Sequence, residues 1–86
     1  MKCLAVYDSG NFAYRVCSIL ERKGYIFEVI SIPCKIAIQG CGYCLEFPED
    51  YIQTVLEESE EAGNPVRIIY KKIPGLTSNK YKKIYP

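Results

Sequence analysis

The chain has 86 residues and a mass of 9.8 kDa, which is enough for one small domain with one core. Hydrophobic residues make up 49% and charged residues 24% of it, which excludes a disordered or collagen-like chain. Histidine is absent, so histidine-based catalytic pairs within the chain and histidine-bearing zinc sites are excluded. The five cysteines are an odd number, which excludes complete pairing in intramolecular disulfides.

The apolar segments of the chain are all short. The run that begins at Met1 soon meets Asp8, which makes it too short for the core of a signal peptide. No other apolar run approaches the length of a membrane span. We therefore expect a cytoplasmic protein with reduced thiols and no membrane partner.

The net charge of +1 hides an asymmetry along the chain. Residues 71–86 contain five lysines and no acidic residue, whereas residues 1–70 contain six basic and ten acidic residues. Pro74-Gly75 and the polar residues after it are typical of loops. We predict one domain over residues 1–71, followed by a flexible basic tail over residues 72–86. The lysines of the tail are few, and no stretch matches the basic-aromatic motif of RNA-recognition sheets, so we expect no nucleic-acid partner.

The first part of the chain predicts a strand, a helix and a second strand. Residues 2–7 form a short apolar run that is typical of a buried strand. From Phe12 the apolar residues recur with helical spacing, and Gly24 is a natural residue to end that helix. Residues 25–32 are rich in β-branched and aromatic residues, which favours a strand, and Pro33 ends it. The apolar face of the helix comprises Ala13, Val16, Cys17 and Leu20.

The second part predicts a strand, a helix and a further strand. Residues 43–47 alternate large apolar residues with smaller or polar ones, which indicates a half-buried strand. Pro48 and the acidic residues after it open a second helix, which ends at Gly63. Residues 66–71 form the fourth strand. The large side chains expected to face the core from the third strand are Tyr43, Leu45 and Phe47.

The predicted order β-α-β-β-α-β fits the α+β class and the ferredoxin-like arrangement. In this arrangement a four-stranded antiparallel sheet carries both helices on one face, because both crossovers are right-handed. The other face of the sheet is then open. Side chains alternate along a strand, so we expect Cys44 and Glu46 to point to the open face.

Three of the five cysteines are candidates for chemistry. Cys34, Cys41 and Cys44 fall within eleven positions, in the loop after the second strand and at the start of the third. Cys3 in the first strand and Cys17 on the apolar face of the first helix are expected to be core residues.

Cys41 has the sequence context of an accessible thiol. It lies between Gly40 and Gly42, which leave the thiol uncovered and closely approachable. A reactive cysteine needs this exposure together with a lowered pKa. Lys35 is the nearest cation in the sequence and would favour the thiolate.

Cys41 and Cys44 form a C-x-x-C motif, and three uses of this spacing stay open. A thioredoxin-like dithiol places its nucleophile at a helix N-terminus, whereas this motif opens a strand. A zinc or iron–sulfur site with Cys34 as a third ligand needs a fourth from Glu46, Cys3 or a second chain. In covalent sulfur chemistry, an exposed thiolate accepts sulfur or selenium and another thiol resolves the product.

The order of segments over residues 3–70 resembles the small bacterial family called selenium/sulfur carrier-like. In that family a Cys-Gly pair is the signature, and its cysteine is taken to carry selenium or sulfur. The matching pieces are Tyr7-Asp8-Ser9, Ala13, Ile19-Leu20, Gly24, Ile32-Pro33, Ile36, Cys41-Gly42, Leu45-Glu46-Phe47 and Pro48-Glu49-Asp50.

The resemblance implies that Cys41 is the carrier residue and Gly42 its partner. From the residues themselves we add Gly40 and Lys35 to the predicted site. We expect a thiol carrier rather than an enzyme, with no cofactor and no resident metal. A donor protein such as a desulfurase would load Cys41, and Cys44 or Cys34 would release the cargo toward an acceptor protein. The alternative is a metal-binding or redox-regulated interaction module that uses all three cysteines. A third possibility is a partner-binding domain whose cysteines are incidental. The sequence predicts no oligomeric state.

Overall fold

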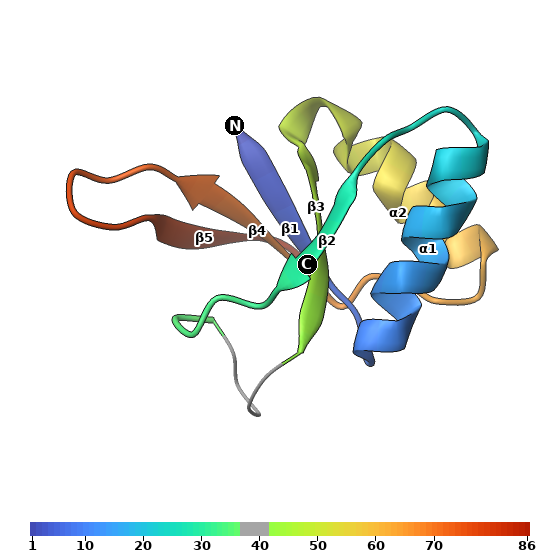
Figure 1. Cartoon of the computed structure of the whole chain (residues 1–86), viewed down its shortest axis with the longest axis horizontal. Coiled ribbons are helices and arrows are strands. Elements are labelled where there is room, and N and C mark those ends of the chain that lie inside the picture. The colour runs from blue at the N-terminus through green and yellow to red at the C-terminus, as the bar shows by residue number, and fades with distance from the viewer. Residues whose placement is uncertain (37–41) are drawn as a thin grey trace.

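The computed structural model describes residues 1–36 and 42–86, which form an antiparallel sheet with two helices against one face (Figure 1). The sheet order is β2-β3-β1-β4-β5, and each neighbouring pair of strands is antiparallel. The predicted α+β class is therefore confirmed. The elements are β1 (Lys2–Val6), α1 (Gly10–Arg22), β2 (Glu28–Ser31), β3 (Tyr43–Pro48), the 3-10 helix η1 (Glu49–Tyr51), α2 (Ile52–Glu61), β4 (Ile68–Ile73) and β5 (Lys80–Tyr85).

The prediction of a four-stranded sheet is wrong, because the described residues form five strands. The additional strand, β5, lies in the lysine-rich segment that the sequence analysis placed outside the domain. It pairs with β4 from Ile73 opposite Lys80 to Ile69 opposite Tyr85. Lysine is depleted in strands, so the composition of the segment concealed this one. The loop-forming residues 74–79 connect the two strands of a hairpin.

Helix α1 begins and ends as local chemistry predicts. The Oγ of Ser9 accepts a hydrogen bond from the backbone N–H of Asn11 at 3.3 Å, which caps the first turn. Gly24 follows the helix with φ of +96°, a conformation that only glycine adopts readily. Neither α1 nor α2 is long and apolar enough to cross a membrane, within the part of the chain described.

The main core lies between the helices and one face of the sheet. The apolar face of α1 contributes three buried residues, and the alternate residues of β1 and β3 meet them. Tyr43 departs from the prediction: it is exposed, and its ring packs edge-on against Tyr14 with centroids 5.5 Å apart. The core comprises Cys3, Ala5, Tyr7, Ala13, Val16, Leu20, Leu45, Phe47, Val55, Val66 and Ile69.

The helix-free face of the sheet is also covered at its centre. Leu4 of β1 points to this face, with Glu46 of β3 and Tyr70 of β4 as its register partners. Lys72 Nζ lies 3.0 Å from Glu46 Oε2, and this ion pair spans β1 because β1 separates β3 from β4. Leu4 and Cys44 are both fully buried. Cys44 and Glu46 therefore share the expected face, but that face is not open where Cys44 lies.

A buried hydrogen bond links the sheet to α2. The hydroxyl of Tyr7, which directly follows β1, lies 2.7 Å from the hydroxyl of Ser59 in α2. Both side chains are buried in the core. Burial raises the pKa of Tyr7 to about 12, against a smaller opposing effect of the hydrogen bond to Ser59.

We expect Tyr7→Phe and Ser59→Ala each to lower the free energy of unfolding by about 1–3 kcal/mol, because each leaves one buried hydroxyl without its partner. The double variant should lose clearly less than the sum, because it removes both polar groups together. Urea unfolding of the four proteins measures this coupling. Strict additivity would mean that the two hydroxyls do not stabilise one another.

Candidate functional site

The connection between β2 and β3 carries the predicted site, and its two ends are joined. The backbone N–H of Ile32 donates to the carbonyl of Gly42 at 2.8 Å. The N–H of Ile36 donates to the carbonyl of Pro33 at 3.0 Å, which closes a four-residue turn. The pairing of β2 with β3 thus continues one step beyond the strands and holds Gly42 next to the start of the connection.

Two of the predicted site residues, Gly40 and Cys41, lie outside the described residues. The described residues place Gly42 at the base of the connection and Tyr43 as the first residue of β3. The predicted role of Cys41 as the carrier residue therefore stays a prediction. The remaining site residues occupy three different environments.

Cys34 has the environment of an accessible thiol. It is exposed and is the second residue of the turn that Pro33 and Ile36 close. It precedes Gly42 by only eight positions, and the hydrogen bond between Ile32 and Gly42 brings the two ends of this segment together. Cys34 is thus available to reagents and to other thiols.

Lys35 contacts a segment that sequence analysis did not associate with the site. Its ammonium donates hydrogen bonds to Ser78 Oγ and to the carbonyl oxygen of Asn79, each at 2.7 Å. Both acceptors belong to the loop between β4 and β5. The structure therefore places the ammonium at the β4–β5 hairpin, where it makes directional contacts. Its predicted influence on the Cys41 thiolate stays a prediction.

Cys44 has the opposite environment to Cys34. It is fully buried on the helix-free face, with Ile30 of β2 as its register partner. The pKa of the Cys44 thiol is raised to about 12, mainly by burial and in smaller part by the nearby carboxylate of Glu46, while Lys72 opposes both effects. At neutral pH this group is a protonated thiol, which is a poor nucleophile and a poor metal ligand.

Cys3 and Cys17 have the structural environments that were predicted for them. Cys3 is fully buried in the main core, and Cys17 is partly buried and donates its thiol to the carbonyl of Phe27 at 3.4 Å. Burial is the main cause that raises the pKa of each thiol. No cluster of three or more potential metal ligands occurs within residues 1–36 and 42–86.

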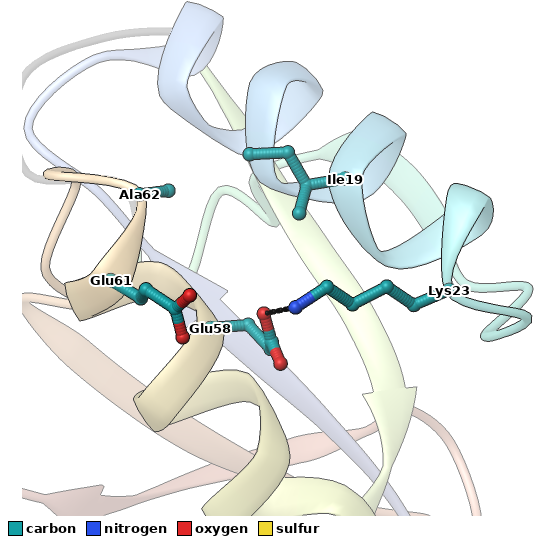
Figure 2. Close-up of a pocket in the computed structure, with 5 residues that line it drawn as sticks. All are labelled: Ile19, Lys23, Glu58, Glu61 and Ala62. Carbon is teal, nitrogen blue, oxygen red and sulfur yellow. Dashed lines mark hydrogen bonds and ion pairs between the residues drawn. The ribbon is translucent and has the colours of Figure 1, made fainter.

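A hollow of about 270 Å³ lies between the C-terminal ends of α1 and α2 (Figure 2). Lys23, which directly follows α1, reaches Glu58 of α2 across it, with 2.6 Å between Nζ and Oε1. Glu61 and the side chains of Ile19 and Ala62 complete the lining. No thiol of the described residues lines the hollow, and the hydrogen bond to Glu58 raises the pKa of Lys23, so its amine stays an ammonium and the arrangement supports an ion pair between the helices.

Sequence reasoning missed the two polar contacts that surround the site. The bonds from Lys35 to residues 78 and 79 join segments more than forty positions apart, and the ion pair of Glu46 and Lys72 joins residues 26 positions apart. No local signal marks either contact, since exposed lysines and glutamates occur throughout the chain. Even the pairing of β5 would not have indicated that the loop of residues 74–79 approaches the site, because β2 and β5 are opposite edges of the sheet.

The raised pKa of Cys44 makes the stability of the protein depend on pH. The thiol ionises near 9.0 in the unfolded chain and near 12 in the folded protein, so its stabilising effect is complete below pH 9 and is lost as pH rises toward 12. Between these values we expect the wild type to lose about 1.4 kcal/mol per pH unit more than Cys44→Ala. Urea unfolding under reducing conditions at several alkaline pH values measures the difference. Cys34→Ala is the matched control, and equal slopes for the wild type and Cys44→Ala would contradict the buried thiol.

Comparison with known proteins places the whole site within one family. The model of the family described as "Putative Se/S carrier protein-like" matches residues 2–71, from β1 to the middle of β4, and includes the connection with Cys34 and Cys41. No curated protein and no solved structure matches the chain. The match covers well over half of the chain and agrees with the resemblance over residues 3–70, so the protein belongs to this family.

Proposed function

We propose that the protein holds sulfur or selenium on Cys41 and passes it from a donor protein to an acceptor protein, without a catalytic reaction of its own. Membership of the family carries this proposal, because the matched region contains the Cys-Gly pair at Cys41 and Gly42. The accessible thiol of Cys34 in the same connection supports it. Thiol chemistry of this kind requires reduced cysteines, so we propose a reducing compartment such as the cytoplasm.

The fold that presents this connection is proposed to be a ferredoxin-like core with one added strand. The order β2-β3-β1-β4, with α1 and α2 on one face, supports this interpretation (Figure 1). The hairpin partner β5 extends the sheet beyond the matched region.

Loading is an exchange between a persulfide and a thiolate. The Cys41 thiolate attacks the terminal sulfur of a donor persulfide, a new S–S bond forms on Cys41, and the donor leaves as its thiolate. Transfer to an acceptor thiolate repeats the same exchange in the forward direction. Neither step requires an external oxidant or reductant, because the transferred sulfur atom keeps the same oxidation state.

Release without an acceptor requires a second thiol in the same chain. The thiolate of that cysteine attacks Cys41 Sγ, a disulfide forms, and hydrogen sulfide leaves. Cys34 is exposed, whereas Cys44 is buried and protonated, so we propose Cys34 as the release thiol. A cellular dithiol reductant then regenerates the carrier.

Burial of Cys44 also bears on the alternative metal-binding module. A site made of Cys34, Cys41 and Cys44 needs all three as thiolates. Ionising Cys44 costs free energy in a fully buried position beside the Glu46 carboxylate, and a bound metal would have to offset that cost. The described part of the site therefore favours the carrier over the metal-binding module.

Incubation with a cysteine desulfurase and cysteine is expected to add about 32 Da, the mass of one sulfur, in a form that reductant removes. Cys41→Ser should abolish this gain, and Cys34→Ser should retain it, because Cys34 acts only after loading. Intact-mass spectrometry measures both. A gain that persists in Cys41→Ser would contradict the proposal.

Loaded protein left without an acceptor is expected to form a disulfide between Cys34 and Cys41 as hydrogen sulfide is released. Trypsin cleaves after Lys35, so these two cysteines fall on different peptides and the disulfide appears as a linked peptide pair. Cys34→Ser should hold the persulfide at least tenfold longer, and Cys44→Ser should release it at the wild-type rate. A disulfide within the peptide that holds both Cys41 and Cys44 would assign release to Cys44 instead.

A further inference from the structure

Lys35 joins parts of the molecule that the sheet topology places far apart. It follows β2, which is one edge of the sheet, while Ser78 and Asn79 precede β5, which is the other edge. Three strands separate these two edges. Residues 32–36, which we call the strap, therefore extend from one edge toward the other.

The strand directions show that the strap and the hairpin loop also start from opposite ends of the sheet. β2 ends at Ser31, next to Tyr43 and thus near the Val6 end of β1. β4 begins opposite Val6 and runs the other way to Ile73, so the hairpin loop lies at the opposite end. In Figure 1 the helices lie on one side of the sheet, while the strap and the hairpin loop extend on the other. The bonds of Lys35 therefore connect them across the helix-free side.

The hairpin loop is tightly turned where it receives Lys35. A Cβ atom at Gly75 would collide with the backbone carbonyl oxygen of Ser78, so the loop can adopt this tight turn only because residue 75 is glycine. The close turn fixes Ser78 Oγ and the carbonyl of Asn79, and both accept from the same ammonium. Because two fixed oxygen atoms accept hydrogen bonds from it, the Lys35 ammonium has a defined position on the hairpin.

The face that the strap approaches contains Cys44, which among the described cysteines is the one that is fully buried outside the main core. No helix covers this face, yet Cys44 has no exposed surface. Its register partner Ile30 and the first strap residue, Ile32, lie on the same side of β2 and its extension. The strap therefore begins on the side of the sheet on which Cys44 lies.

We propose that Lys35 is a positioning residue whose contact with the β4–β5 hairpin holds the strap over Cys44 and so keeps the Cys44 thiol out of thiol chemistry. The positioning role of Lys35 does not depend on the proposed function. Only the benefit of keeping Cys44 unreactive during sulfur transfer rests on it. Ser78 and Asn79 lie outside the matched region of residues 2–71, so the device adds to what the family match covers. It makes the hairpin part of the functional unit.

Native-state alkylation tests this proposal with an internal control. Iodoacetamide labelling of unloaded protein at neutral pH is followed at each cysteine by peptide mass spectrometry. Cys3 and Cys44 are both fully buried but lie on opposite faces of the sheet, so local opening of the strap would raise the labelling rate of Cys44 without raising that of Cys3. We expect Lys35→Ala to raise the labelling rate of Cys44 relative to Cys3 at least tenfold.

Three further variants locate the effect. Lys35→Arg should restore a rate near that of the wild type, because a guanidinium donates to the same two oxygens. Ser78→Ala should give a smaller rise, since it removes one of the two acceptors. Lys82→Ala, which removes an exposed lysine from the same hairpin, should change nothing. An unchanged ratio in Lys35→Ala, or an equal rise at Cys3 and Cys44, would overturn the proposal.

The outcome is independent of sulfur loading, because no donor is present during labelling. If the strap opens as expected but Cys41 accepts no sulfur, the proposed function fails and the positioning role of Lys35 stands. If Cys41 accepts sulfur and the labelling ratio is unchanged, only the positioning role fails.

Discussion

The structure depends on covering both faces of a sheet that has helices on only one of them. A small domain buries only a modest area of apolar surface, so each buried face contributes much of its stability. The central strand β1 is buried on both sides. The helices cover one side in the usual way. On the other side an ion pair between β3 and β4 passes over β1, and the strap meets the hairpin loop. On this side of the sheet, polar contacts between side chains rather than a helix thus lie over the buried residues of β1.

This way of covering the sheet sorts the thiols by environment. Cys3 lies under the helices and Cys44 on the opposite face, and burial keeps both protonated at neutral pH. Cys34 lies in a turn at the surface. In the proposed carrier, the thiols that take no part in transfer must stay unreactive, because a stray thiolate would divert the cargo. Burial has this effect on Cys3 and Cys44 by raising the pKa of each thiol.

The sequence predicted what local patterns determine. Helical spacing, the cap at Ser9 and the break at Gly24 gave the first helix, and the segment order gave both the α+β class and the family. Residues 80–85 were misjudged because lysine-rich composition disguised a strand whose pairing is not local. The burial of Cys44 was missed for a related reason: alternation gives the face of a side chain, but not what covers that face.

The lysines of β5 have a consequence for how copies of this protein meet. An edge strand presents unpaired backbone groups, which invite pairing with the edge of another molecule. β5 has three lysines and no acidic residue, so two such edges in register would bring like charges together with little screening between them. The strand that completes the sheet therefore also discourages edge-to-edge pairing between copies of this protein.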